Sequence, residues 1–185
     1  MGGRSKDGVE VTTLTVDALN AMPKADFIAC LGGIYEHSPW VAEQTAGERP
    51  FSGKEHLADR MRAAVENADE SAKLALIRAH PDLAGKLARA GTLSAESTRE
   101  QAGLGLDRLS DAEFERFSDL NNRYRERFGF PFVICVRLTD RPGILAAFER
   151  RLEHDVAAEI AEALRQIHHI AGLRLGDLLT ESQVT

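Results

Sequence analysis

Helix-start signals recur along almost the whole chain, and they constrain the fold more than any other feature of the sequence. SGKE at 52–55 and SDAE at 110–113 both match the capping box, in which Ser and Glu satisfy each other's end of a helix. Pro23 and Pro39 can each open a helix, because the ring fixes φ near the helical value. After the second box, helical spacing relates Phe114, Phe117, Asn121, Tyr124 and Phe128, and Gly129 offers a stop.

Only the run FPFVICVRL at 130–138 has the aromatic and β-branched content of an extended segment. One strand cannot make a sheet, so we expect a buried extended connection or the start of another helix. Helices are predicted after Asp140 and from Asp155, the last one carrying an apolar stripe through Val156, Ile160, Leu164, Ile167, Ala171 and Leu178. The sequence therefore predicts an all-α, single-domain bundle of about seven or eight helices with one buried extended segment.

The length of 185 residues suits one domain, and the 43% hydrophobic content is that of an ordinary globular protein. We expect this domain over residues 15–180, with a flexible N-terminal arm at 1–14 and a C-terminal tail at 181–185. The net charge of -6 argues against a nucleic-acid partner, which would require an excess or a cluster of Lys and Arg. No cluster of Lys and Arg suggests one either.

Cys30 and Cys135 lie far apart in apolar surroundings, which fits reduced, buried thiols and a cytoplasmic protein. The longest apolar runs are shorter than the roughly 18 residues that a membrane span needs. The amino terminus lacks the apolar core of a signal peptide. We therefore expect neither a membrane partner nor export.

His80 stands where a helix must stop, in LIRAHPDLAG at 76–85, because the residue before proline is pushed out of the α region. The carboxyl end of a helix carries partial negative charge and unpaired carbonyls, which favour a protonated imidazole. His80 is therefore either a helix cap or a proton-transfer group, and this segment alone leaves both open.

Ser97 and Glu100 share a face if the segment after Ser94 is helical, since they are three residues apart. A hydroxyl and a carboxylate would then point at one spot; alternatively, Glu100 belongs to a solvated surface. Arg174 occupies a position on the apolar stripe of the last helix. An unpaired buried guanidinium is expensive, so Arg174 needs a carboxylate, a ligand or an outward path for its long side chain.

His80, Glu100 and Arg174 together indicate a cofactor-free site for a small anionic substrate, with the arginine binding charge and the other two moving protons. A metal site is not expected. The adjacent pair His168-His169 would point about 100° apart on a helix, and no HExxH or CxxC motif is present. GLGLD at 103–107 also lacks the Lys and Ser/Thr of a phosphate-binding loop.

Four segments in order resemble the OHCU decarboxylase family, where OHCU is 2-oxo-4-hydroxy-4-carboxy-5-ureidoimidazoline. They are LGGIYEHSPWVAE at 31–43, ALIRAHPDLAGKLA at 75–88, GTLSAESTREQAGLGLD at 91–107 and NNRYRERFGFPFVICVR at 121–137, within a resemblance that spans roughly 16–179. The resemblance implies an all-helical carboxy-lyase of urate degradation and purine metabolism. Such an enzyme needs no cofactor, is usually a homodimer, and releases carbon dioxide from OHCU to give (S)-allantoin.

The resemblance also implies roles for individual residues. The family's catalytic histidine falls on His80, with Pro81 beside the substrate. Its active-site glutamate falls on Glu100, and its substrate-binding arginine on Arg174. Other residues implied to hold the substrate are Ser97 and Gln101, together with main-chain groups of Phe132, Val133, Ile134, Cys135 and Val136.

The tripeptide HPD at 80–82 supports one alternative from another class, because it is also the signature of J-domain co-chaperones. In that family it lies between two helices and stimulates an Hsp70 ATPase. Here the preceding DESAKLALIRAH lacks a strongly basic face, and Leu83-Ala84-Gly85 replaces the usual aromatic and lysine. A bare tripeptide is a weak signal without its context.

Overall fold

The computed structural model describes residues 14–84 and 93–179, and the chain in these ranges is helical apart from turns and one extended stretch. The described residues form nine α-helices: α1 (Val16–Ala21), α2 (Lys24–Leu31), α3 (Trp40–Thr45), α4 (Lys54–Glu66), α5 (Glu70–Arg78), α7 (Ala95–Gly103), α8 (Asp111–Phe128), α9 (Arg141–Arg151) and α10 (Val156–Leu178). Two 3₁₀ turns, η1 (Ala46–Glu48) and η2 (Val136–Leu138), complete the set.

The predicted all-α class is confirmed, and the helix count slightly exceeds the expected one because α1 and α3 are only six residues long. Within the described ranges, strand-like pairing is limited to one isolated bridge between Leu14 and Leu179. Of the predicted arm at 1–14, all but Leu14 lies outside the described residues, as does the tail at 181–185.

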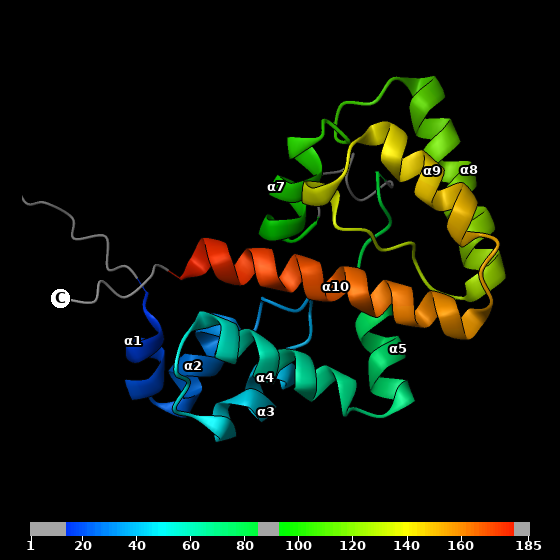
Figure 1. Ribbon diagram of the computed structural model, residues 1–185. Coiled ribbons are helices and arrows are strands. Elements are labelled where there is room, and N and C mark those ends of the chain that lie inside the picture. Colours follow the sequence, from blue (N-terminus) through cyan, green and yellow to red (C-terminus); the bar gives the residue numbers. More distant parts are fainter. Residues whose placement is uncertain (1–13, 85–92, 180–185) are drawn as a thin grey trace, which may run out of the picture.

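Helix α10 runs through the middle of the molecule (Figure 1). Helices α1 to α5 lie on one side of it, and α7, α8 and α9 lie on the other. The apolar face of α10 is rotated slightly from the predicted stripe: Val156 and Leu178, at its two ends, are exposed, while Ile170 and Leu175 are buried. A residue on the buried part of α10 is therefore within reach of both groups of helices.

The two predicted capping boxes have different outcomes in the structure. Ser110 and Glu113 form the predicted capping box, with the Ser110 N–H donating to Glu113 at 2.9 Å, and Gly129 ends α8 with φ of 76°. The predicted box at 52–55 is wrong, because Gly53 is the N-cap of α4 and makes no side-chain cap. Ser52 lies one residue too early, and its N–H donates to His56 Nδ1 at 3.1 Å instead.

The predicted extended segment is confirmed as a buried connection between α8 and η2. Among the described residues no strand pairs with it, and two of its main-chain groups bind side chains instead. Arg151 Nη1 donates to the Val133 carbonyl at 2.7 Å, and the Cys135 N–H donates to Gln166 at 3.0 Å. Phe132 stacks on Phe148 at 3.7 Å between ring centroids, so the aromatic core fixes the segment from its other side.

Arg151 is itself fully buried, and its charge is balanced by Glu159 on α10. The Arg151 Nε donates to Glu159 at 2.8 Å, and the Tyr124 hydroxyl also donates to that carboxylate. This ion pair joins α9 to α10 behind the extended segment. The protein thereby holds main-chain groups of Val133 and Cys135, within the stretch from Phe132 to Val136 that the family resemblance assigns to substrate binding.

Candidate active site

His80 follows α5 directly, after the C-cap residue Ala79, and only 7% of its surface is exposed. Its Nδ1 lies 3.0 Å from the Leu76 carbonyl oxygen, one of the unpaired carbonyls of the helix end. A carbonyl can only accept, so Nδ1 carries the proton in this hydrogen bond. In the neutral ring Nε2 is then the basic nitrogen. His80 therefore caps the helix through Nδ1 and can accept a proton on Nε2.

The Nε2 atom of His80 is buried and has no hydrogen-bond partner among the residues that the structure describes. Burial lowers the pKa of His80 to about 4, although the Leu76 carbonyl and the Glu36 carboxylate favour the protonated form. The ring is therefore neutral at pH 7 in the free protein. A buried polar atom without a hydrogen-bond partner is unusual in proteins and is explained here if Nε2 bonds to a bound substrate.

Arg174 extends from the middle of the molecule on α10, and 6% of its surface is exposed. Its Nε and Nη2 donate to the two carboxylate oxygens of Glu100 at 2.8 Å each, which is the bidentate geometry. Its Nη1 donates to Glu36 Oε2, also at 2.8 Å. Of the three possibilities for this buried guanidinium, the structure therefore supplies the first, with two carboxylates. Burial lowers the pKa of Arg174, but the bonds to Glu100 and Glu36 raise it further, so the net shift is upward.

Ser97 and Glu100 do share a face of α7, as predicted, and both contact Arg174. Ser94 caps this helix by accepting the Ser97 N–H at 3.2 Å. Glu100 is therefore not part of a solvated surface. Farther along α7, Gln101 accepts the Ala84 N–H at 2.9 Å and so ties the helix to the chain that follows His80.

Glu36 is a site residue that the sequence reasoning missed. It lies in the turn between α2 and α3, within the 31–43 motif, and is 2% exposed. Burial raises its pKa, but the Ser94 hydroxyl and Arg174 lower it further, so the net shift is downward and the carboxylate is ionised. Its neighbours along the chain are the buried Tyr35 and the exposed His37, so no local pattern in the sequence marked it as a site residue.

The predicted residues meet at one hollow of about 40 Å³. Ten of the eleven predicted residues line it: His80, Pro81, Ser97, Glu100, Gln101, Phe132, Val133, Ile134, Val136 and Arg174. Leu83 and Ile170 complete the lining. Cys135 does not line it, and burial raises the pKa of its thiol. The structure thus brings the predicted set together, while their roles stay predictions.

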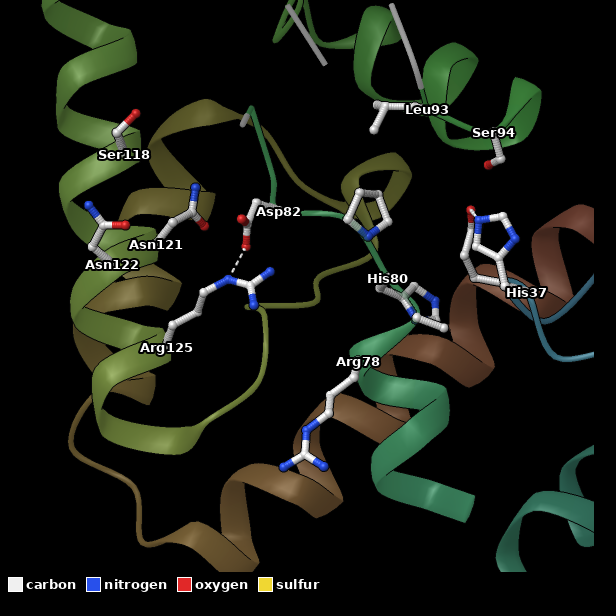
Figure 2. A pocket seen from close by; sticks show the side chains of 13 residues that line it. His37, Arg78, His80, Asp82, Leu93, Ser94, Ser118, Asn121, Asn122 and Arg125 are labelled. Carbon is white, nitrogen blue, oxygen red and sulfur yellow. Dashed lines mark hydrogen bonds and ion pairs between the residues drawn. The ribbon is translucent and has the colours of Figure 1, made fainter. Parts of the chain in front are cut away.

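A larger cavity of about 520 Å³ adjoins this hollow at His80 and Pro81, which line both. Figure 2 shows it from close by, with His80 on one side and Arg125 paired to Asp82 on the other, at 2.8 Å. A site for a small ligand is commonly larger than ~300 Å³. The small hollow suits one functional group, and the larger cavity has room beside it.

No group of three His, Cys, Asp or Glu side chains in the described ranges is arranged to hold a metal ion. His168 contacts Tyr35 instead, with its Nδ1 2.9 Å from the Tyr35 hydroxyl. Cys30 and Cys135 are free thiols, Cys30 exposed rather than buried as expected. Over these same ranges, no helix combines the length and apolarity that crossing a membrane requires.

The co-chaperone alternative receives no support from this geometry. A tripeptide that contacts a partner protein needs an accessible surface, whereas His80 is buried against the end of α5. The HPD sequence at 80–82 serves here as a helix stop that places an imidazole in a hollow.

Comparison with known proteins agrees with these features. Residues 20–176 match the family model described as OHCU decarboxylase. A Haloferax volcanii protein named 2-oxo-4-hydroxy-4-carboxy-5-ureidoimidazoline decarboxylase is 44% identical over 164 residues, covering 89% of this chain and 95% of its own. A mouse protein of the same name is 41% identical over 161 residues, covering 87% and 90%.

Among solved structures, a crystal structure of (S)-allantoin synthase superimposes with a TM-score of 0.70 at 35% sequence identity. The match covers 90% of this chain and 54% of that longer one. Motif, fold and site geometry thus agree with the family model, and the chain belongs to the OHCU decarboxylase family.

Proposed function

We propose that this protein is a carboxy-lyase that converts OHCU to (S)-allantoin in urate breakdown. The observation that carries the proposal is the meeting of His80, Glu100, Ser97 and Arg174 at one hollow, from α7, α10 and the end of α5. These are the residues onto which the family's motifs fall. A histidine with an unengaged ring nitrogen beside a fixed charged cluster suits proton transfer on a bound substrate.

The chemistry needs no electron sink from outside the substrate. When the bond to the carboxylate breaks, carbon dioxide leaves and its electron pair moves into the neighbouring C=N of the ring, which takes up a proton. The adjacent hydroxyl then becomes a carbonyl as its proton is lost, and a proton is added to the carbon that bears the ureido group. Overall, a substrate anion and one proton give carbon dioxide and neutral allantoin.

His80 would take the hydroxyl proton on Nε2 and return it to carbon on one face of the ring. Its Nδ1 bond to the Leu76 carbonyl fixes both the tautomer and the ring orientation during this exchange. Glu100 and Ser97 would hold polar groups of the substrate with Arg174, while the ordered main chain of Phe132 to Val136 would hold the heterocycle. Addition of the proton from one side would give a single enantiomer.

The test generates OHCU in situ from urate and follows circular dichroism after the protein is added. We expect accelerated formation of (S)-allantoin, compared with the racemic product of spontaneous decay. A product that appears no faster and without optical activity would rule out the proposed function.

We further propose that residues 15–180 form the catalytic domain and that the protein is a cytoplasmic homodimer without a resident cofactor. The family match at 20–176 lies within these limits, and free thiols are usual in a reducing compartment. Sedimentation of the purified protein tests the dimer: a species of one chain at micromolar concentration would contradict it.

Fractionation of the source cells tests the cytoplasmic location. Activity of the isolated 15–180 fragment tests the domain limits.

A further inference from the structure

We propose that Glu36 is a positioning residue of this site, which anchors Arg174 and supplies the negative charge against which His80 takes up a proton. The inference rests on the proposed decarboxylase function and adds a residue to which the family's motifs gave no role. It begins with the geometry of the guanidinium.

Glu36 takes the one terminal nitrogen of Arg174 that Glu100 leaves free. Glu100 engages Nε and Nη2, and Glu36 Oε2 accepts from Nη1 at 2.8 Å. The same oxygen accepts the Ser97 hydroxyl at 3.1 Å, so Glu36 also fixes the start of α7. Loss of this carboxylate would leave Nη1 with only the longer bond to the Gly33 carbonyl, at 3.5 Å, and would loosen the guanidinium on its Glu36 side.

The cluster of Glu36, Glu100 and Arg174 carries more negative than positive charge. Glu36 and Glu100 together carry two negative charges against the single positive charge of Arg174, all in a setting that water barely reaches. Excess buried charge is unfavourable unless another group balances it. Oε1 of Glu36 is itself buried and accepts no hydrogen bond from the residues that the structure describes. This negative charge favours a positive group beside it. The mostly exposed ring of His37 is one such group, with its Nε2 3.7 Å from Oε1.

His80 is the buried imidazole that lines the larger cavity together with Glu36. The carboxylate of Glu36 favours its protonated form, while Arg174 and the exposed His37 oppose it. The remaining charged groups around the ring are Glu100 across the small hollow, and Arg78, Asp82 and Arg125 along the larger cavity. Asp82 and Arg125 largely cancel because they pair with each other at 2.8 Å. Removal of the Glu36 charge should therefore lower the pKa of His80.

This arrangement fits the proton balance of the reaction. The substrate enters as a carboxylate, and the products carbon dioxide and allantoin are neutral, so one proton is consumed in each turnover. The imidazolium form of His80 arises during the cycle, and Glu36 stabilises it.

The deciding variant is Glu36→Gln, which keeps an oxygen for Arg174 Nη1 and removes the charge. We expect the limb of the kcat/KM pH profile that reports His80 to move to lower pH by about one unit, the shift usual for loss of one nearby charge. The direction holds whether the neutral or the protonated ring is the active form, because either limb follows the same pKa. Glu43→Gln, an equivalent change at an exposed position of α3, should leave the profile unchanged.

Glu36→Asp separates anchoring from charge, since it keeps the carboxylate but withdraws it by one methylene. We expect kcat/KM to fall at least about tenfold while the limb stays near its wild-type pH, because a misplaced positioning group is costly at this scale. Wild-type kinetics in folded Glu36→Asp would overturn the anchoring role, and this variant carries the test if Glu36→Gln does not fold.

NMR titration of the His80 ring needs no substrate and so keeps the two proposals distinguishable. We expect the ring in Glu36→Gln to stay neutral to lower pH than in the wild type. An inactive wild type with this shift present would reject the decarboxylase and leave the role of Glu36 as charge partner intact. An active wild type with no shift in Glu36→Gln, by kinetics and by NMR, would reject the inference alone.

Discussion

One ring nitrogen of His80 holds the end of α5, and the other has no partner among the residues that the structure describes. Replacement by Asn keeps an amide donor for the Leu76 carbonyl, whereas replacement by Ala removes both functions. We expect both variants to lower turnover by about 10²–10⁴, the range for a positioned acid–base group. Only His80→Ala should also lose about 1 kcal/mol of stability, the typical value of one hydrogen bond.

Turnover and urea denaturation of the two variants, measured side by side, separate these contributions. Near-normal turnover in a folded His80→Asn would mean that the histidine is a helix cap and nothing more.

The pKa of His80 also predicts how stability depends on pH. Burial lowers it from 6.5 in the unfolded chain to about 4 in the folded protein, so the unfolded state binds more protons between these values. Stability should therefore fall as the pH drops from about 6.5 to 4, by up to ~3 kcal/mol for this residue.

His168 changes in the same direction, because burial lowers its pKa to about 4 as well. The comparison of wild type with His80→Asn isolates the first residue. Denaturation midpoints at several pH values should decline less steeply in the variant, and equal slopes would contradict the assigned pKa of His80.

Arg174→Met tests how much the positive charge beside Glu36 and Glu100 contributes to stability. A well-packed apolar residue often replaces a buried ion pair without loss, but here only one partner is removed and Glu36 and Glu100 are left uncompensated. We expect a loss of about 3–5 kcal/mol, the usual cost of breaking a buried pair. Adding Glu100→Gln to the variant should recover part of that loss, which a double-mutant cycle measures. A variant as stable as the wild type would show that the cluster contributes little to folding.

The residues proposed to carry the chemistry, His80, Ser97, Glu100 and Arg174, could be picked out from the sequence, because each has a local signal: a following proline, a helix cap or a position on an apolar stripe. Glu36 had none of these. It lies in a turn with no periodic face, and its partner Arg174 is 138 positions away in sequence. Burial of a loop residue depends on packing between distant segments, which one sequence does not specify.

Helices and their ends follow mostly from local rules, and the exceptions are instructive. Ser110 caps α8 as predicted, while Ser52 fails to cap α4 by a single residue. The extended segment was predictable from composition, but its partners were not. Arg151 and Gln166 replace the strand that would ordinarily satisfy its main chain, and both come from later helices.

Arg151→Met tests this support at the level of elements. It would leave the fully buried Glu159 with only His154 and the Tyr124 hydroxyl as partners, and the Val133 carbonyl without the Arg151 donor. We expect a loss of about 3–5 kcal/mol, because a stranded buried charge is costly. Arg116→Met, at an exposed arginine of α8, should change stability by less than about 0.5 kcal/mol.

Urea denaturation of both variants provides the measurement. Equal, small losses in the two would mean that the extended segment is held by its aromatic packing alone.

At the scale of the whole molecule, the all-α class was predictable and the arrangement around α10 was not. Helical periodicity gives each element a face but does not say which faces meet. The grouping of α1 to α5 on one side of α10 and α7 to α9 on the other is a property of packing (Figure 1).

The proposed cofactor-free mechanism makes a prediction for the protein as a whole. Prolonged dialysis against EDTA should leave turnover within about twofold of the untreated enzyme, because the proposed electron sink lies in the substrate and not in a metal ion. Activity that is lost on chelation and restored by one divalent cation would contradict this mechanism.

The carboxylates that hold Arg174 come from positions 138 and 74 residues away along the chain, on the two sides of α10. Contacts at such separations close the largest loops of a folding chain and form after local helices do. The charged cluster is therefore completed only when both groups of helices have docked. The group that contains α7 can hold Glu100 and Ser97 against Arg174, but an intermediate with the other group undocked would lack Glu36 and His80 and should be catalytically silent.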